Sequence, residues 1–277
     1  MTSFRASAPL TPDADWRHFD LRVADGVATI TLNRPDKLNA LTFEAYADLR
    51  DLLAELPHRD DARVVVLSGE GRGFCSGGDV EEIIGELRKL DAAGLLAFTR
   101  MTGATVKAMR ECPLPIVAAI NGVAAGAGSV LALASDFRLL ARSASFAFLF
   151  TRVGLAGADM GSAYLLPRIV GLGRATELLM LGDRLDAETA LRIGLASDLV
   201  DDDELPARAA ALARRLADGP AFAYATTKSL IAKELDMDLA GAIELEAFAQ
   251  ALLMTSHDHH EFLDAWRDGR RPDWKGR

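Results

Sequence analysis

One stretch organises the chain, and it reads Pro113-Leu-Pro-Ile-Val-Ala-Ala-Ile-Asn-Gly-Val-Ala-Ala-Gly-Ala-Gly-Ser-Val-Leu-Ala-Leu-Ala-Ser135. The apolar run at 116–120 is too short for a helix and is flanked by turn residues, which is typical of a buried parallel strand. Gly126-Ala-Gly128 then leads into a helix rich in Ala and Leu. A strand, a glycine loop and a helix N-terminus in this order can point free backbone N–H groups at an anion.

A second stretch has the same design. The run Val64-Val-Val-Leu67 predicts another buried strand, and Ser68-Gly-Glu-Gly-Arg-Gly-Phe-Cys-Ser-Gly-Gly-Asp79 follows it before a helical run from Val80. Two such loops can each aim one N–H at the same oxygen atom, which makes an oxyanion hole. A dinucleotide-binding fold fits less well, because the glycine spacing after residue 120 misses its fingerprint.

The composition narrows the class of protein. The chain has 277 residues, half of them hydrophobic, and a net charge of −9, which argues against non-specific nucleic-acid binding. No apolar run reaches the roughly 18 residues of a membrane span. The two cysteines, Cys75 and Cys112, belong to no metal-like cluster of Cys and His. We therefore expect a cytoplasmic protein with no nucleic-acid partner, no membrane partner and no metal site.

Three regions follow from the pattern along the chain. Residues 1–15 are rich in Ser, Ala, Pro and Asp and are expected to be disordered. Residues 16–217 alternate short apolar runs with amphipathic ones, which predicts an α/β core, and residues 218–277 are expected to be helical. Strands are expected at 19–23, 27–32, 64–67, 116–120 and 136–140, with a further apolar stretch at 145–150 and a strand-like turn at 195–200. Helices are expected at 42–56, 80–90, 95–110, 128–135, 174–181, 186–193, 205–217, 222–235, 238–254 and 259–267.

Five segments match the pattern of one family, in order: Asn33–Leu41, Gly73–Asp79, Pro115–Gly128, Val153–Gly171 and Ala187–Val200. On these segments the chain resembles the crotonase (enoyl-CoA hydratase/isomerase) superfamily over roughly residues 20–275. The resemblance implies a spiral of βαβ units followed by a C-terminal helical trimerisation region, in a homotrimer or a dimer of trimers. It also implies an acyl-CoA substrate and no cofactor beyond the CoA thioester of that substrate.

The resemblance further implies roles for particular residues. The oxyanion hole of the family falls on the backbone N–H groups of Gly78 and Ala127, and backbone donors do not depend on the side chain. Contacts to the substrate and its CoA moiety fall on five residues of two loops: Lys37, Leu38, Ala40, Ser76 and Asp79. A solvated loop lysine is the alternative for Lys37. Trp266 and Arg270 would reach the CoA site of a neighbouring subunit.

The chain departs from typical hydratases of the family at the acid–base groups. Val130 and Phe150 occupy the positions of the two usual glutamates, and neither side chain can transfer a proton. Asp159 stands at the acidic position of the isomerase-like branches, counted back from the downstream Leu-Pro-Arg168. Between Gly154 and Asp159 the chain has one residue more than the family pattern. An N-cap for a helix that starts at Met160 is the alternative role for Asp159.

An apolar pocket is expected around this carboxyl group. Its residues are Phe148, Phe150, Val130 and Met160, and burial among them would raise the pKa of Asp159. Gly73-Phe-Cys75-Ser-Gly77 superficially fits a nucleophile elbow, but the resemblance places no His near it. We therefore expect Cys75 to be a small buried side chain.

Three functions remain open at this point. A carboxyl group that takes a proton from C2 and returns it to C4 would shift a double bond, from a 3-enoyl-CoA to a 2-enoyl-CoA. Asp159 could instead be the base for enoyl-CoA hydration or thioester hydrolysis. The loss of both glutamates also allows a non-catalytic acyl-CoA-binding protein.

Overall fold

Two β-sheets form the framework of residues 16–276, which the computed structural model describes; the disorder expected for residues 1–15 lies outside this range. The larger sheet has the order β1-β2-β3-β5-β7-β10 and the smaller the order β4-β6-β8-β9. The larger sheet consists of β1 (Phe19–Ala24), β2 (Gly26–Leu32), β3 (Ala62–Gly69), β5 (Ile116–Ile120), β7 (Phe137–Ala141) and β10 (Asp198–Val200). The smaller consists of β4 (Gly73–Cys75), β6 (Val123–Ala125), β8 (Ser145–Ala147) and β9 (Leu185–Asp186).

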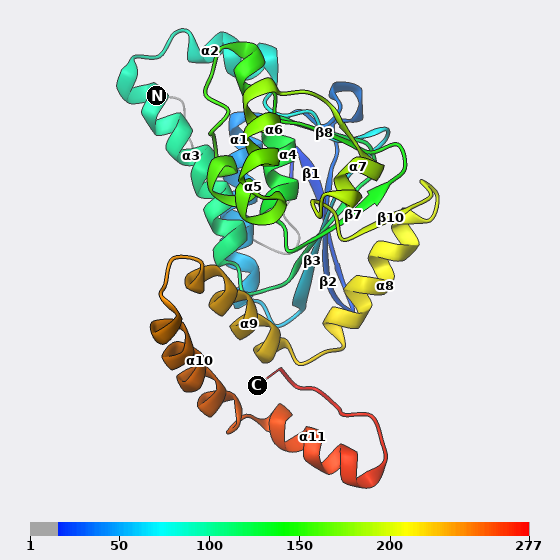
Figure 1. Ribbon diagram of the computed structural model, residues 1–277. Helices are drawn as coiled ribbons and strands as arrows, with labels where there is room; N and C mark the ends of the chain where they lie inside the picture. Colours follow the sequence, from blue (N-terminus) through cyan, green and yellow to red (C-terminus); the bar gives the residue numbers. More distant parts are fainter. Residues whose placement is uncertain (1–15, 277) are drawn as a thin grey trace.

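The chain visits the two sheets alternately. Strand β3 leads into β4, β5 into β6 and β7 into β8, and the strands of successive turns pair in parallel in both sheets. Parallel neighbours need a crossover between them. The crossovers include α1 (Phe43–Glu55) after β2, α3 (Ala92–Glu111) after β4, α4 (Ala127–Ala134) after β6 and α5 (Ser162–Val170) after β8. The predicted spiral of βαβ units is confirmed (Figure 1).

Two local predictions near the N-terminus are also confirmed. Strands β1 and β2 pair antiparallel up to Ala24 and Val27. The turn residues Asp25 and Gly26 have φ values of 51° and 79°, the positive values that a type I′ turn needs. The hydroxyl of Thr42 accepts a hydrogen bond from Ala45 N at 3.2 Å and so caps α1.

Two predicted elements are divided in the structure. The helix expected at 80–90 consists of a π-helix at Val80–Ile84 and a short α2 at Gly85–Leu87. A glycine inside this segment lowers its helix propensity. The apolar stretch at 145–150 contains β8 and then enters a 3-10 helix at Leu149–Val153.

The remaining helices complete the chain: α6 (Leu172–Leu181), α7 (Ala187–Arg192), α8 (Leu205–Ala217), α9 (Ala221–Glu234), α10 (Leu239–Leu253) and α11 (His257–Asp268). Helix α8 covers one face of the larger sheet, where its buried Ala213 shares a hydrophobic cluster with Val64 and Val117. The other cluster holds most of the buried residues and fills the space between the sheets and α1, α3 and α4. Within residues 16–276, no helix is long and apolar enough to cross a membrane.

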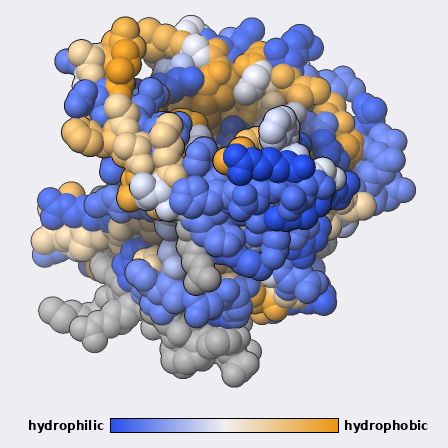
Figure 2. Space-filling model, turned by 90° about the horizontal axis from the view of Figure 1, so that it is seen from below, coloured by the Kyte–Doolittle hydropathy of each residue, from blue (hydrophilic) through white to orange (hydrophobic). Residues whose placement is uncertain are grey.

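The C-terminal helices form a layer of their own below the sheets (Figure 1). Helix α9 is tied to the core, because its buried Lys228 donates to the carbonyl of Leu114 at 3.0 Å. Helix α10 has no buried residue within this chain and exposes Leu239, Phe248 and Leu252. Seen from below, apolar surface gathers on one side of the molecule (Figure 2).

Candidate active site

The pairing of β4 with β6 brings the two glycine loops into contact. Cys75 lies opposite Ala124 in this pair. A Cβ built on Gly77 would lie 3.4 Å from Ala127 N, so the two loops touch at this point. A Cβ built on Gly128 would lie only 2.1 Å from the carbonyl oxygen of Cys75, which excludes any side chain there. The glycines therefore permit a close approach of two backbones.

Two backbone N–H groups are left free at this contact. Leu41 and Gly78 form an isolated parallel β-bridge. Its hydrogen bonds run from Leu41 N to Gly77 O at 2.7 Å and from Asp79 N to Leu41 O at 2.8 Å, so the N–H of Gly78 takes no part in them. Ala127 is the first residue of α4, where an N–H has no partner inside the helix. Within residues 16–276 neither group donates a hydrogen bond. Two adjacent unpaired donors, one of them at a helix N-terminus, can stabilise a negative oxygen.

A buried asparagine holds the preceding loop in place. The side chain of Asn39 accepts from Arg34 N at 2.9 Å and donates to Gly73 O at 2.7 Å. Ser76 N donates to Leu38 O at 2.9 Å, which joins this loop to the one that carries Gly78. Asn39 was not singled out from the sequence. In the structure its φ is 57°, a left-handed value that asparagine tolerates better than most residues.

The residues expected to contact CoA differ in their exposure and in the hydrogen bonds that they already make. Lys37 is exposed and its Nζ lies 2.8 Å from Glu81, whose hydrogen bond and charge raise the pKa of Lys37. Ser76 Oγ donates to Lys37 O at 3.2 Å. The backbone of Ala40 is engaged, because its carbonyl accepts from the Arg34 guanidinium at 2.7 Å.

Asp79 is buried and supports the loop. Its Oδ1 accepts from the N–H groups of Glu81 and Glu82 at 3.0 Å each, and its Oδ2 lies 3.1 Å from Arg34. Burial would raise the pKa of Asp79, but the two N–H groups and the charge of Arg34 outweigh it and hold the pKa below its usual value. The carboxylate therefore has structural partners on both oxygens. Arg34 is a second residue that sequence reasoning missed.

Asp159 is half-buried in the loop before α5. Its Oδ1 accepts from Met160 N at 2.9 Å, and its own N–H donates to the hydroxyl of Ser162 at 3.1 Å. Burial raises the pKa of Asp159, and the Met160 hydrogen bond offsets part of this effect. Helix α5 starts at Ser162 with Gly161 as its N-cap and no side-chain cap. The carboxylate therefore does not cap the helix, and no cation pairs with it within residues 16–276.

The four residues expected to form an acyl pocket share the larger hydrophobic cluster. They are Val130, Phe148, Phe150 and Met160, each less than a tenth exposed. Cys75 is fully buried beside them, and burial raises the pKa of its thiol to about 12. A thiol of this pKa stays protonated near neutral pH, as expected for a packing residue. Among residues 16–276, no three His, Cys, Asp or Glu side chains lie close enough to hold a metal.

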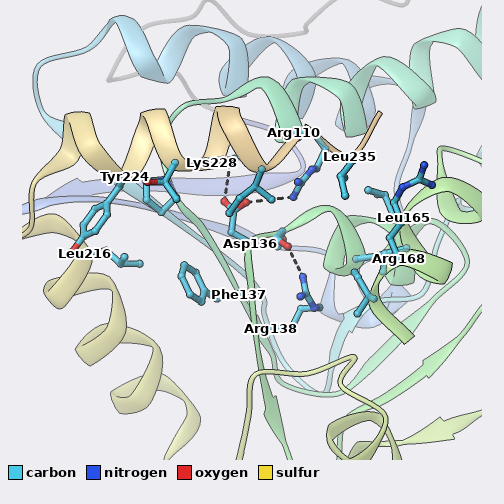
Figure 3. A pocket seen from close by; sticks show the side chains of 16 residues that line it. Arg110, Asp136, Phe137, Arg138, Leu165, Arg168, Leu216, Tyr224, Lys228 and Leu235 are labelled. Carbon is cyan, nitrogen blue, oxygen red and sulfur yellow. Dashed lines mark hydrogen bonds and ion pairs between the residues drawn. The ribbon is translucent and has the colours of Figure 1, made fainter. Parts of the chain in front are cut away.

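A separate cavity of about 460 Å³ lies at the opposite end of α4, between the core and α9. Figure 3 shows Asp136 between Lys228 and Arg110. Lys228 Nζ lies 2.7 Å from Asp136, and Arg110 lies 3.4 Å from it. The buried Arg138 donates to the carbonyls of Ser135 and Leu195, and burial lowers its pKa to about 10. Lys228 and Arg110 are thus engaged with a carboxylate, and Arg138 is engaged with the carbonyls of Ser135, directly after α4, and of Leu195, after α7.

Comparisons with known proteins give one consistent result. A sequence model described as enoyl-CoA hydratase/isomerase matches residues 22–277. The chain is 37% identical to the 1,2-epoxyphenylacetyl-CoA isomerase of Escherichia coli (strain K12), over 92% of this chain and 97% of that protein. It is similar along its whole length to a crystal structure from Streptomyces coelicolor A3(2) that is provisionally described as an enoyl-CoA hydratase, with 63% identity, complete coverage of both chains and a TM-score of 0.94. The crystal structure of enoyl-CoA hydratase from Bacillus anthracis has a TM-score of 0.88 at 30% identity, over 94% of this chain and 100% of that one.

Proposed function

The chain belongs to the enoyl-CoA hydratase/isomerase family, and we propose that it processes acyl-CoA thioesters through an enolate held by the backbone N–H groups of Gly78 and Ala127. One observation carries the proposal. Two unpaired backbone donors lie just beyond the paired strands β4 and β6, where the two loops touch at Gly77 and Ala127, and the half-buried carboxylate of Asp159 has no cationic partner within residues 16–276. A donor pair and an unneutralised base are the two parts that enolate chemistry needs.

Double-bond shift is the reaction that one carboxylate can complete. Asp159 takes a proton from C2 of a 3-enoyl-CoA, and the electron pair of that C–H bond moves onto the thioester oxygen. The two N–H groups stabilise the negative oxygen. Asp159 then returns the proton to C4, the double bond moves to C2–C3, and the carboxylate is regenerated. The raised pKa of Asp159 favours this exchange, because it makes the carboxylate a stronger base than an exposed aspartate.

Hydration is the second candidate, and the names of two structural relatives favour it. Water addition needs a group that activates water and a group that protonates C2. Val130 and Phe150 stand where typical hydratases carry glutamates, and both are buried in the apolar cluster. Asp159 would then have to supply both functions, which makes fast hydration the less favoured reaction.

The CoA moiety would lie along the loops that carry Lys37, Leu38, Ala40 and Ser76. Lys37 is exposed and can exchange Glu81 for a phosphate. The backbone of Leu38 lies against Ser76 at the same edge, where Ser76 N meets Leu38 O at 2.9 Å. No cofactor beyond the CoA thioester is needed for this chemistry.

A homotrimer or a dimer of trimers is the assembly that we propose, in the cytoplasm. Helix α10 leaves its apolar side chains exposed in the single chain, including Leu239 and Phe248. Trp266 of α11 is also exposed, and in an assembly it can reach the CoA site of a neighbour. Exposed apolar patches of this kind are typical of contact surfaces. Arg270 pairs with Glu261 and Asp268 in the single chain, and in an assembly it could exchange them for the CoA of a neighbour.

The test incubates the protein with a panel of CoA esters in heavy water. Proton NMR and mass spectrometry then report deuterium exchange at C2, the position of the double bond and any gain of water. The panel contains 3-enoyl, 2-enoyl and dienoyl CoA esters. We expect deuterium at C2 with a shifted double bond, and a loss of about 100-fold or more in Asp159→Asn. A gain of one water without a shift would support hydration instead. Binding without exchange of any ester would indicate a non-catalytic acyl-CoA-binding protein.

A further inference from the structure

Arg138 of β7 is a buried cation without a carboxylate partner. Its side chain is 8% exposed and lines the cavity of about 460 Å³ between the core and α9. Its Nε donates to Leu195 O at 2.6 Å and its Nη1 donates to Ser135 O, and both acceptors are neutral. Within residues 16–276 it forms no ion pair, and its Nη2 donates no hydrogen bond and is not sealed off by protein atoms. A guanidinium has five N–H groups, so Arg138 keeps donors for a ligand.

Asp136 is the one carboxylate among the described residues that line this cavity, and it is already shared. Its Oδ2 lies 2.7 Å from Lys228 Nζ, and its Oδ1 lies 3.4 Å from Arg110. Arg168, which also lines the cavity, is balanced by Asp236 outside it at 3.3 Å. The other three cations of the wall therefore share a single negative charge, which leaves two positive charges in excess.

This excess charge is unfavourable because the cations lie inside the protein. Burial lowers the pKa of Arg138 to about 10, although the charge of Asp136 opposes the effect. The carbonyl groups at the end of α4 stabilise a nearby cation, but they carry only partial charge and cannot neutralise it. A buried ion that lacks a counter-ion destabilises the surrounding structure. An anion in the cavity would supply the missing negative charge.

The remainder of the cavity wall is mainly apolar. Figure 3 shows Phe137, Leu216 and Tyr224 on one side of Asp136, and Leu165 and Leu235 on the other. These side chains come from β7, α5, α8 and α9 or its end, so one chain forms the cavity without a second copy. Pockets of about 300–1,000 Å³ with apolar walls and a few polar groups are typical of small-molecule sites. An organic anion with an apolar body matches this wall in both charge and polarity.

The cavity is distinct from the candidate active site. Helix α4 carries Ala127 at its first turn and ends at Ala134, directly before Ser135 in the cavity wall. At a rise of about 1.5 Å per residue, roughly 12 Å of helix separates the proposed oxyanion hole from the cavity. Neither Asp159 nor any residue expected in the acyl pocket lines the cavity.

We propose that this cavity is a second ligand site, which binds a free carboxylate with an apolar chain. The carboxylate pairs with Arg138, because a planar guanidinium can bind a carboxylate through two parallel hydrogen bonds. The chain lies between α5 and α9, against Leu165 and Leu235. This site goes beyond the proposed function, since its ligand is an acid and not a thioester.

The test measures equilibrium binding to the full-length protein by calorimetry, with three probes. Octanoate has both the charge and the apolar chain, octanamide has the chain without the charge, and butyrate has the charge with a shorter chain. We expect octanoate to bind with one site per chain, at least about tenfold more tightly than either of the other probes. Equal affinity for octanoate and octanamide overturns the proposal, and so does the absence of saturable octanoate binding.

Two kinds of variant locate the site. Arg138→Gln should weaken octanoate binding about tenfold or more, whereas Arg192→Gln, which removes an exposed charge on α7, should leave it unchanged. Ile231 is 56% exposed in the α9 wall, so its replacement should be tolerated even if Arg138→Gln fails to fold. Ile231→Glu should weaken octanoate binding several-fold more than Ile231→Gln, which has the same shape without the charge.

Equal octanoate affinity in Ile231→Glu and Ile231→Gln overturns the proposal, as does full affinity in a folded Arg138→Gln protein. Asp159→Asn distinguishes the cavity from the candidate active site, because it should leave octanoate affinity unchanged. A change of affinity in this variant would place the acid at the active site and contradict a second site. The proposed function fails separately, through absence of C2 exchange, because octanoate binding needs no turnover.

Discussion

Arg34 and Asp79 are 45 positions apart in the chain, yet a guanidinium nitrogen of Arg34 lies 3.1 Å from a carboxylate oxygen of Asp79. The pair connects the loop that carries Lys37 to the loop that carries Gly78. The same guanidinium donates to Ala40 O at 2.7 Å, so the Arg34 side chain contacts both loops of the candidate site. The largely buried Arg34–Asp79 ion pair, together with backbone hydrogen bonds, therefore fixes the positions of the two loops relative to each other.

Asp79→Ala should lower the free energy of unfolding by about 2 kcal/mol, because it removes a helix cap and leaves Arg34 with less compensation. Urea denaturation measures this change. The folded-state pKa of Asp79 is lowered, so its stabilisation is present above the unfolded-state pKa and disappears as pH falls through the folded-state value. The difference between wild-type protein and the variant should therefore shrink in acid.

Asp36→Ala is the matched control for that change. Asp36 is exposed on the same loop, so its loss should alter the free energy of unfolding by no more than about 0.5 kcal/mol. Equal destabilisation by both variants would contradict a specific role for the buried pair.

Ala127→Pro should reduce C2 exchange by about 100-fold to 1,000-fold, because it deletes one donor of the proposed oxyanion hole. Proline is tolerated at the first position of a helix, and Ala127 is the first residue of α4. Ala127→Gly keeps the N–H and should retain activity within about threefold of wild type. Far-UV circular dichroism confirms that both variants are folded, and a fully active, folded proline variant would remove Ala127 from the mechanism.

The pH profile of C2 exchange should report the buried carboxyl group. Burial raises the pKa of Asp159, so kcat/KM should rise with pH, reach half its maximum above the value of about 4 of an exposed aspartate, and then level off. The midpoint in the free enzyme is read from the acidic limb. A midpoint at or below the exposed value would contradict the role of a desolvated base.

Asp159→Asn should leave the protein at least as stable as wild type at neutral pH. The folded-state pKa is raised, so the stabilisation from the protonated carboxyl is present below the unfolded-state pKa and is lost as pH rises through the folded-state value. At neutral pH the wild-type charge opposes folding, and the amide removes that charge. Thermal unfolding of the two proteins at pH 7 measures the difference, and a large loss of stability would instead assign Asp159 a structural role.

Phe248→Asp should dissociate the proposed oligomer into monomers near the chain mass of 29.7 kDa. Phe248 is 68% exposed on α10, where a charge would disrupt an apolar contact between subunits but would be harmless in a monomer. Sedimentation velocity distinguishes the species. Ala207→Asp, on the exposed first turn of α8, introduces the same charge elsewhere and should keep the wild-type mass. Wild-type protein that sediments as a monomer would contradict the proposed assembly.

Much of the architecture was predictable because its signals are local. The run at 116–120 is apolar on both faces and became a fully buried strand, and Asp25-Gly26 formed the hairpin turn. Thr42 capped α1, as its position predicted. Each of these depends on residues within a few positions of one another, so periodicity and turn chemistry suffice to identify them.

The sequence by itself determined the alternation of strands and helices, the helical C-terminal region and the two glycine loops, because each is encoded by neighbouring residues; the spiral arrangement was implied by the resemblance to the family. Only the tertiary structure decided which groups meet at the site. The approach of Gly128 to Cys75 and the pairing of Arg34 with Asp79 both join residues from separate elements. Such contacts depend on strand register and helix packing, which a local pattern does not contain. The burial that raises the pKa of Asp159 likewise arises from the packing of residues distant in sequence.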